Sequence, residues 1–130
     1  MQVACPRGGE VEARRFYAEG LGLVEVDKPA ALRSRGGAWF RSAGPADAVR
    51  AELHVGVEDP FAPARKAHPA LLLDSVAELD EVGGRLRSLG YAVDATERDT
   101  FPGHERLHAA DGHGNRVELL APVTGASGRA

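Results

Sequence analysis

The chain lacks several features that mark specialised classes of protein. It holds a single cysteine, Cys5, so no disulfide can form within the chain, which suits a reducing compartment. Its longest apolar run, Ala70 to Leu73, is far too short to span a membrane, and no signal peptide is visible. We therefore expect a cytoplasmic protein that does not associate with membranes.

No charge of one sign dominates the sequence. The formal net charge is −3, and basic and acidic residues are interleaved, so no basic face is expected and nucleic acid is not an expected partner. The 130 residues are 43% hydrophobic and 27% charged, as is ordinary for a soluble globular protein. This length predicts one domain with a substantial core.

What the chain does contain is an internal repeat. The segment Leu-Gly-Leu at 21–23 follows one amphipathic stretch, and Leu-Gly-Tyr at 89–91 follows another, 68 residues later. The pattern Arg-x-Glu-Leu also occurs twice, at 50–53 and at 116–119. Self-similarity at a fixed period indicates that one supersecondary unit is used twice.

Each half is predicted to contain one helix and four short strands. Period-two alternation and turn residues predict the strands, and apolar residues spaced by three to five predict the helices. Ser75 and Glu78 form a capping box that opens the second helix. Gly83 and Gly84 interrupt that helix, either through a close approach of its backbone to the sheet or by chance. The expected strands are 2–5, 23–26, 38–41, 51–57, 70–73, 91–95, 104–109 and 116–120, and the expected helices are 10–19 and 76–89.

The fold class that follows is α+β, with two tandem β-α-β-β-β modules forming curved mixed sheets around a cavity. Module one spans residues 1–57 and module two spans 68–122. A proline-containing connector at 58–67 joins them as a surface crossing. Residues 43–45 form a turn, and the Gly/Ser/Ala-rich tail at 123–130 is expected to be disordered.

This order of modules resembles the vicinal oxygen chelate superfamily, which includes glyoxalase I, bleomycin-resistance proteins, fosfomycin-resistance enzymes and extradiol dioxygenases. Because fold does not fix function, the resemblance identifies the family better than any one activity. The segments that carry it are Ala-Arg-Arg-Phe-Tyr (13–17), Arg-Gly-Gly-Ala-Trp-Phe (35–40), Glu-Leu-His (52–54), His-Pro-Ala (68–70) and Gly-Asn-Arg-Val-Glu (114–118).

The resemblance implies a divalent metal, Zn, Ni, Mn or Fe, bound by residues of the first and last strands. His68 and Glu118 match two ligand positions, and Glu52 matches a third, in agreement with the Arg-x-Glu-Leu repeat. The first-strand match in module one falls before Met1, so the predicted ligand set is incomplete, although Gln2 shares that face of the strand. Open metal positions would accept two adjacent oxygens of a small molecule. Glu52 or Glu118, freed from the metal, would move a proton.

Further side chains are predicted to contact a small-molecule ligand. His54 shares a strand face with Glu52, which makes it a rival metal ligand or a substrate contact. Trp39 belongs either to the core or to the binding site. The residues His104, Arg106 and His108 alternate on one face that is either solvated or turned to the cavity. The predicted substrate-binding set is Gln2, Trp39, His54, Arg106 and His108.

Two functions of different classes follow. One is a metal-dependent lyase or dioxygenase of the glyoxalase kind, with Glu52 and Glu118 as catalytic carboxylates. The other is a metal-free protein that binds a drug or metabolite without catalysis, as bleomycin-resistance proteins do. Two curved, open sheets leave strand edges and apolar patches uncovered, so we also expect a homodimer.

Overall fold

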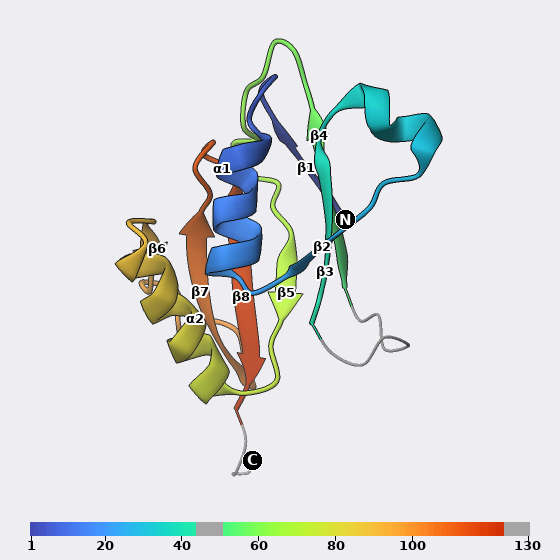
Figure 1. Ribbon diagram of the computed structural model, residues 1–130. Coiled ribbons are helices and arrows are strands. Elements are labelled where there is room, and N and C mark those ends of the chain that lie inside the picture. Colours follow the sequence, from blue (N-terminus) through green and yellow to red (C-terminus); the bar gives the residue numbers. More distant parts are fainter. Residues whose placement is uncertain (44–50, 124–130) are drawn as a thin grey trace.

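The computed structural model describes residues 1–43 and 51–123, which form two four-stranded sheets and the helices beside them (Figure 1). The strand order is β1-β4-β3-β2 in the first sheet and β5-β8-β7-β6 in the second. The strands are β1 (Gln2–Cys5), β2 (Val24–Val26), β3 (Ala38–Arg41), β4 (Glu52–Val57), β5 (Ala70–Leu72), β6 (Val93–Asp94), β7 (His104–Ala110) and β8 (Arg116–Pro122).

The two sheets repeat one topology. In each, the first strand pairs in parallel with the last strand, and the remaining pairs are antiparallel. The predicted α+β fold with two β-α-β-β-β modules is therefore confirmed. The predicted turn at 43–45 lies mostly outside the described residues, as does the predicted tail from residue 124 onward.

The helices differ more from the sequence-based expectation than the strands do. The predicted helix at 10–19 is an α-helix, α1 (Glu10–Arg14), which continues as a π-helix, η1 (Arg15–Gly20). A 3-10 helix, η2 (Ala30–Arg35), was not predicted, because no apolar periodicity marks those residues. The second helix, α2 (Val76–Ser88), lies where it was expected. Within the described part of the chain, no helix is long and apolar enough to cross a membrane.

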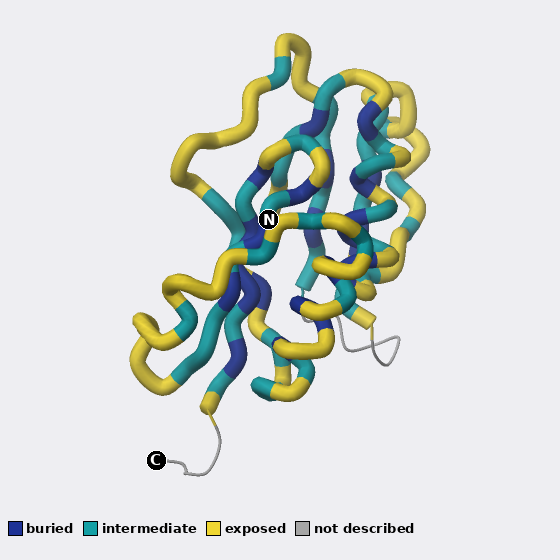
Figure 2. Tube along the Cα trace, turned by 90° about the vertical axis from the view of Figure 1, so that its left-hand side faces the viewer, coloured by how far each residue is buried: buried dark blue, intermediate teal, exposed yellow. Residues whose placement is uncertain are grey.

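One hydrophobic core extends through both modules. Alternate residues of the strands are buried against the helices, such as Phe40 in the first sheet and Leu119 in the second. The helices also pack on each other, where the rings of Phe16 and Tyr91 meet edge to face with centroids 4.9 Å apart. In Figure 2 the buried residues are the dark-blue stretches of the tube. Because the helices cover one face of each sheet, the opposite faces are free to carry polar side chains.

Local sequence signals explain the placement of α2. The hydroxyl of Ser75 accepts a hydrogen bond from the backbone N–H of Glu78 (3.1 Å), so the predicted cap is present. A Cβ on Gly83 would lie 2.7 Å from Cδ1 of Leu107 in β7, whereas one on Gly84 would meet nothing within 4 Å. The close approach of helix to sheet therefore accounts for Gly83 but not for Gly84.

A buried polar network joins the modules. The Tyr17 hydroxyl on η1 donates to the Asp111 carboxylate in the β7–β8 turn (2.7 Å). Asp111 also accepts from the backbone N–H groups of His113 and Asn115, both at 2.9 Å, and the Asn115 amide donates to the carbonyl of Ala4 in β1 (2.7 Å). Burial, with the Asp111 charge as a smaller cause, raises the pKa of Tyr17, so its hydroxyl remains a donor.

Substituting Tyr17→Phe should lower the free energy of unfolding by about 1–3 kcal/mol, because it leaves buried Asp111 short of a donor. Tyr91→Phe is the matched control, since the hydroxyl of Tyr91 bonds Glu12 in a partly exposed place and its loss should cost less. Urea unfolding of the three proteins measures both effects. Equal losses for the two variants would contradict the role given to Asp111.

Candidate metal and ligand site

Three side chains of module two meet on the open face of the second sheet. His68 lies just before β5, His108 on β7 and Glu118 on β8, and one ligand atom from each lies within 4.8 Å of the others. Two pairings bring them together. His108 is directly opposite Glu118 in the β7–β8 register, and the N–H of Glu118 donates to the carbonyl of Pro69, the neighbour of His68 (2.9 Å).

Both imidazoles approach the same oxygen of Glu118. The Nε2 atom of His68 lies 3.2 Å from Oε1, and Nε2 of His108 lies 3.6 Å from it. The two rings are 5.7 Å apart, edge to face. A small cation near Oε1 would therefore be reached by two nitrogens and one oxygen, a donor set typical of Zn and other transition metals.

The hydrogen bond on the far side of His68 sets the orientation of its ring. Nδ1 of His68 lies 2.7 Å from the carbonyl oxygen of Lys66, which can only accept, so Nδ1 carries a proton. In the neutral ring, Nε2 then presents a lone pair toward a carboxylate oxygen. That arrangement is repulsive until a proton or a metal ion lies between them. A carbonyl bonded to the outer nitrogen is also the usual way in which metal-ligating histidines are oriented.

Glu118 is the most buried member of the group, with 6% of its surface exposed. Burial alone would raise its pKa, but the contact with Nε2 of His68 and the charge of Arg106 outweigh burial and lower the pKa below the usual value. Nη1 of Arg106 lies 3.5 Å from Oε2 of Glu118, so the two carboxylate oxygens face different partners.

Arg106 is itself fixed by the loop between β6 and β7. Its Nη2 donates to the hydroxyl of Thr100 (2.6 Å) and its Nε to the carbonyl of Glu97 (3.2 Å). The sequence interpretation named neither residue, and no sequence pattern marks them. These contacts give Arg106 a position from which it holds Glu118, while its predicted contact with substrate stays a prediction.

The other predicted site residues gather on the open face of the first sheet. Trp39 and His54 are cross-strand neighbours whose rings stack with centroids 3.7 Å apart and planes 1° from parallel. Gln2 pairs with His54 in the register of β1 and β4. Nε2 of His54 lies 3.1 Å from Glu52, whose other oxygen accepts from Arg41 (2.5 Å). The hydrogen bonds from Arg41 and His54 lower the pKa of Glu52.

Glu52 is not a member of the group formed by His68, His108 and Glu118. The expected convergence of Glu52 on His68 and Glu118 does not occur within one chain, because Glu52 belongs to the other sheet. Its role as a third ligand or proton shuttle stays a prediction. The third member of the group is His108, which was predicted to contact the substrate.

The strand registers show why the Arg-x-Glu-Leu repeat wrongly made Glu52 the counterpart of Glu118. The N–H of His54 donates to the carbonyl of Met1, just as the N–H of Glu118 donates to that of Pro69. His54, and not Glu52, is therefore the structural counterpart of Glu118. By the same register, Trp39 in module one corresponds to His108 in module two. Glu52 lies two positions away on the same strand face, because side chains alternate along a strand.

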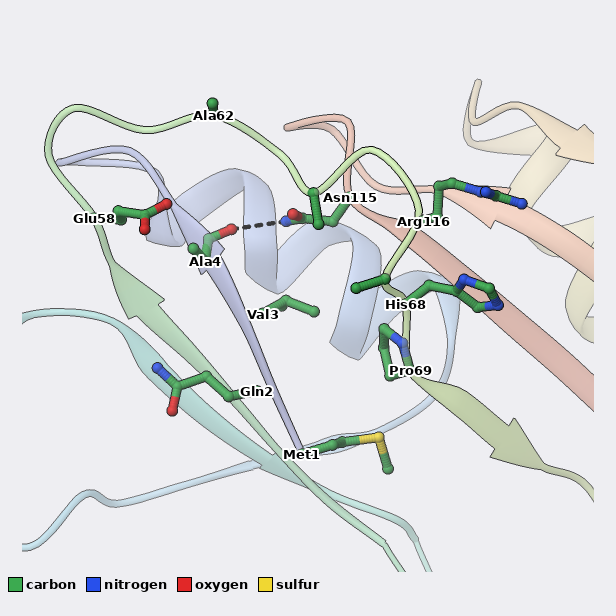
Figure 3. A pocket seen from close by; sticks show the side chains of 12 residues that line it. Met1, Gln2, Val3, Ala4, Glu58, Ala62, His68, Pro69, Asn115 and Arg116 are labelled. Atoms are coloured by element: carbon green, nitrogen blue, oxygen red, sulfur yellow. Dashed lines mark hydrogen bonds between the residues drawn. The ribbon is translucent and has the colours of Figure 1, made fainter.

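A cavity of about 540 Å³ adjoins His68 between β1 and the connector (Figure 3). Figure 3 shows Val3 and Ala4 of β1 on one side and His68 and Pro69 on the other, with the Asn115–Ala4 hydrogen bond between them. Its wall from the connector consists of small residues such as Ala62. His68 and Pro69 therefore border a space that is large enough for a small molecule.

Comparison with known proteins defines the class to which this fold and site belong. Residues 11–119 match the family model described as the Glyoxalase/Bleomycin resistance protein/Dioxygenase superfamily, and the chain belongs to this superfamily. A comparison with curated proteins found no match.

Solved structures agree with this assignment. A glyoxalase family protein from Bacillus anthracis is 38% identical, with a TM-score of 0.79 over 93% of this chain and 90% of that one. TnmS3, an antibiotic binding protein from Streptomyces sp. CB03234, is 26% identical, with a TM-score of 0.63 over 93% of each chain. Lactoylglutathione lyase from Agrobacterium tumefaciens shares the fold at 24% identity and a TM-score of 0.62, over 93% of this chain and 91% of that chain.

In metal-free protein, Arg106→Met should lower the free energy of unfolding by about 1–3 kcal/mol, because it removes a charged partner of buried Glu118. Arg14→Met is the control, since Arg14 pairs with Glu25 at a more exposed place and its loss should cost about 0–1 kcal/mol. Chemical denaturation in chelator measures both. An Arg106→Met variant as stable as wild type would show that Glu118 does not depend on this contact.

Proposed function

We propose that this protein binds a small molecule at a divalent metal held by His68, His108 and Glu118. The observation that carries the proposal is the direction of the two Nε2 atoms, which approach one oxygen of an ionised, buried carboxylate. Residues of module two alone supply this set. The ligand missing from module one is then not required.

The chain's own residues prepare the group for a metal. The Lys66 carbonyl holds the His68 ring in the tautomer that leaves Nε2 free to bind. Arg106 occupies Oε2 of Glu118 and leaves Oε1 to the two histidines. Two imidazoles and one carboxylate suit Zn, Ni, Mn or Fe(II) and leave coordination positions open. When bound, such a metal supplies Lewis acidity to adjacent oxygens of a ligand.

The contacts of Glu52 bear on whether binding leads to catalysis. A lyase of the glyoxalase kind needs a group that accepts a proton, and a useful base has a pKa near the working pH. Arg41 and His54 lower the pKa of Glu52, which makes it a poor base in this chain. We therefore favour ligand binding over proton transfer by Glu52, and keep a lyase or dioxygenase activity as the alternative that depends on Glu118 and the metal.

Calorimetric titration of chelator-treated protein with Zn, Ni, Mn and Fe(II) tests the metal site. His68→Ala, His108→Ala and Glu118→Gln should each weaken binding by at least about 100-fold, since each removes a direct ligand, a larger loss than that of an outer partner. His54→Ala and Glu52→Gln are matched controls from module one and should leave the affinity within about threefold of wild type.

Two results would contradict the metal proposal. One is binding weaker than about 0.1 mM for every metal, which leaves less than roughly 5.5 kcal/mol for the site. The other is an equal loss of affinity in the module-one controls. Either result would favour the metal-free binding protein, whose candidate surface is the Trp39–His54 face of the first sheet.

We also propose that the protein is a homodimer. Met1 and Leu72 are 49% and 68% exposed, and both line an apolar groove of about 350 Å³ beside the free edge of β5. Exposed apolar residues at an unpaired strand edge are typical of a surface covered by a partner. A cytoplasmic location stays a prediction.

Sedimentation of the protein should give a mass of twice 13.7 kDa, and Leu72→Lys should shift it toward the monomer, because a charge would be buried at the edge of β5. Val11→Lys is the control, because Val11 is 75% exposed on α1, away from this groove. A monomer at every concentration tested would contradict the proposal, as would a dimer that Leu72→Lys leaves unchanged.

A further inference from the structure

A second cavity lies on the open face of the first sheet. His68, His108 and Glu118, which we call the metal group, lie on the second sheet. Its volume is about 220 Å³, which suits a single ring with one substituent better than an extended ligand. η2, the helix that the sequence did not predict, closes one side, and β3 and β4 form the floor. The lining residues are Gln2, Lys28, Leu32, Arg35, Gly36, Trp39, His54, Val55, Gly56 and Val57.

One wall of this cavity is aromatic. Trp39 and His54 stack in parallel from adjacent strands, and the contact of His54 with Glu52 fixes the imidazole in place. Each stacked ring covers one face of the other, so the pair offers a ligand the outer face of one ring, already held in place and without further loss of side-chain entropy. Leu32 and Val57 add apolar surface to it. These features favour a planar, apolar body for the ligand.

The rim of the cavity is basic. Lys28 and Arg35 both line it, and none of its lining residues, all within the described part of the chain, is acidic. Arg35 is exposed and has no ion-pair partner in residues 1–43 and 51–123. The ammonium of Lys28 donates to the carbonyl of Gly36 and retains further donors, since it has three. Oε2 of Glu10 would lie 3.0 Å from a Cβ on Gly36, so this carboxylate partly offsets the charge of Lys28. Arg35 is the cation that most favours an anionic group on the ligand.

Gly56 and Gln2 add a neutral polar group to the same cavity. A Cβ on Gly56 would lie 2.5 Å from Nε2 of Gln2, so the glycine makes room for this amide beside β4. The amide can donate and accept, and it therefore suits a carboxylate oxygen as well as a hydroxyl.

We propose that this cavity binds a small planar anion, an aromatic carboxylate, whose ring packs against the outer face of the Trp39–His54 pair and whose carboxylate meets Lys28 and Arg35. The site is independent of the metal group, because no residue of the cavity belongs to that group. It therefore does not rest on the proposed metal function, and either can fail alone. Electrostatic attraction to the basic rim orients the ligand, and the aromatic wall selects its shape.

Trp39 is the only tryptophan in the chain, so its fluorescence reports directly on the cavity. The full-length protein is titrated with benzoate in the presence of EDTA, which removes any metal. We expect a saturable change in fluorescence with a Kd of about 1 mM or tighter. Cyclohexanecarboxylate, with the same charge but no planar ring, should bind about three- to tenfold more weakly, because it loses the aromatic contact.

Charge-removing variants test the rim, and both replaced residues lie outside the core. Arg35→Gln and Lys28→Gln should each weaken benzoate binding about three- to tenfold, as expected for partly exposed charged contacts. Arg7→Gln removes an equal charge from an exposed residue outside the cavity and should leave binding unchanged. Trp39→Leu, followed by calorimetry, should abolish the difference between the two carboxylates.

Some outcomes would overturn the proposal. No saturable change up to about 10 mM benzoate would remove the site. Equal affinity for the planar and non-planar carboxylates would remove the aromatic wall as the selecting feature. If Arg7→Gln weakened benzoate binding as much as Arg35→Gln, the effect would come from the net charge of the protein and not from the basic rim. Benzoate binding that EDTA abolishes would assign the anion to the metal group instead.

Discussion

One buried carboxylate holds together the parts on which the site depends. Asp111 accepts hydrogen bonds from Tyr17 of module one and from backbone and side-chain groups of Asn115 in the β7–β8 turn. It therefore fixes both the docking of the modules and the turn from which β7 and β8 run in register. That register is what sets His108 opposite Glu118. A polar group in the core thus determines the geometry of an imidazole-carboxylate group on the opposite face of the sheet.

The fold could be predicted from the sequence because its signals are local. Alternating strands, the Ser75 cap and the repeated module each depend on residues near one another in the chain, and all were found. The site could be predicted only in part. His68 and Glu118 come together as expected, but the choice between Glu52 and His108 depends on strand register, which no local pattern encodes. η2 was missed because its residues carry no apolar period.

The two modules share the same strand pairing but carry different side chains at equivalent positions. The strand positions that hold His108 and Glu118 in module two hold Trp39 and His54 in module one. An imidazole and a carboxylate occupy these positions in one sheet, and a stacked aromatic pair occupies them in the other. Because the backbone hydrogen bonds are shared, neither set of side chains is needed to form the sheet. The two open faces are thus free to differ in what they bind.

The connector, although it is a surface loop, helps to orient His68 through the carbonyl of Lys66. Insertions in exposed loops are usually tolerated, since they disturb no packed element. Here, however, the last turn of the loop holds the proton-bearing nitrogen of His68. The backbone of residues 58–67 thus helps to set the direction in which the imidazole faces Glu118. The contact between these two side chains depends on the path of an exposed loop as well as on the residues themselves.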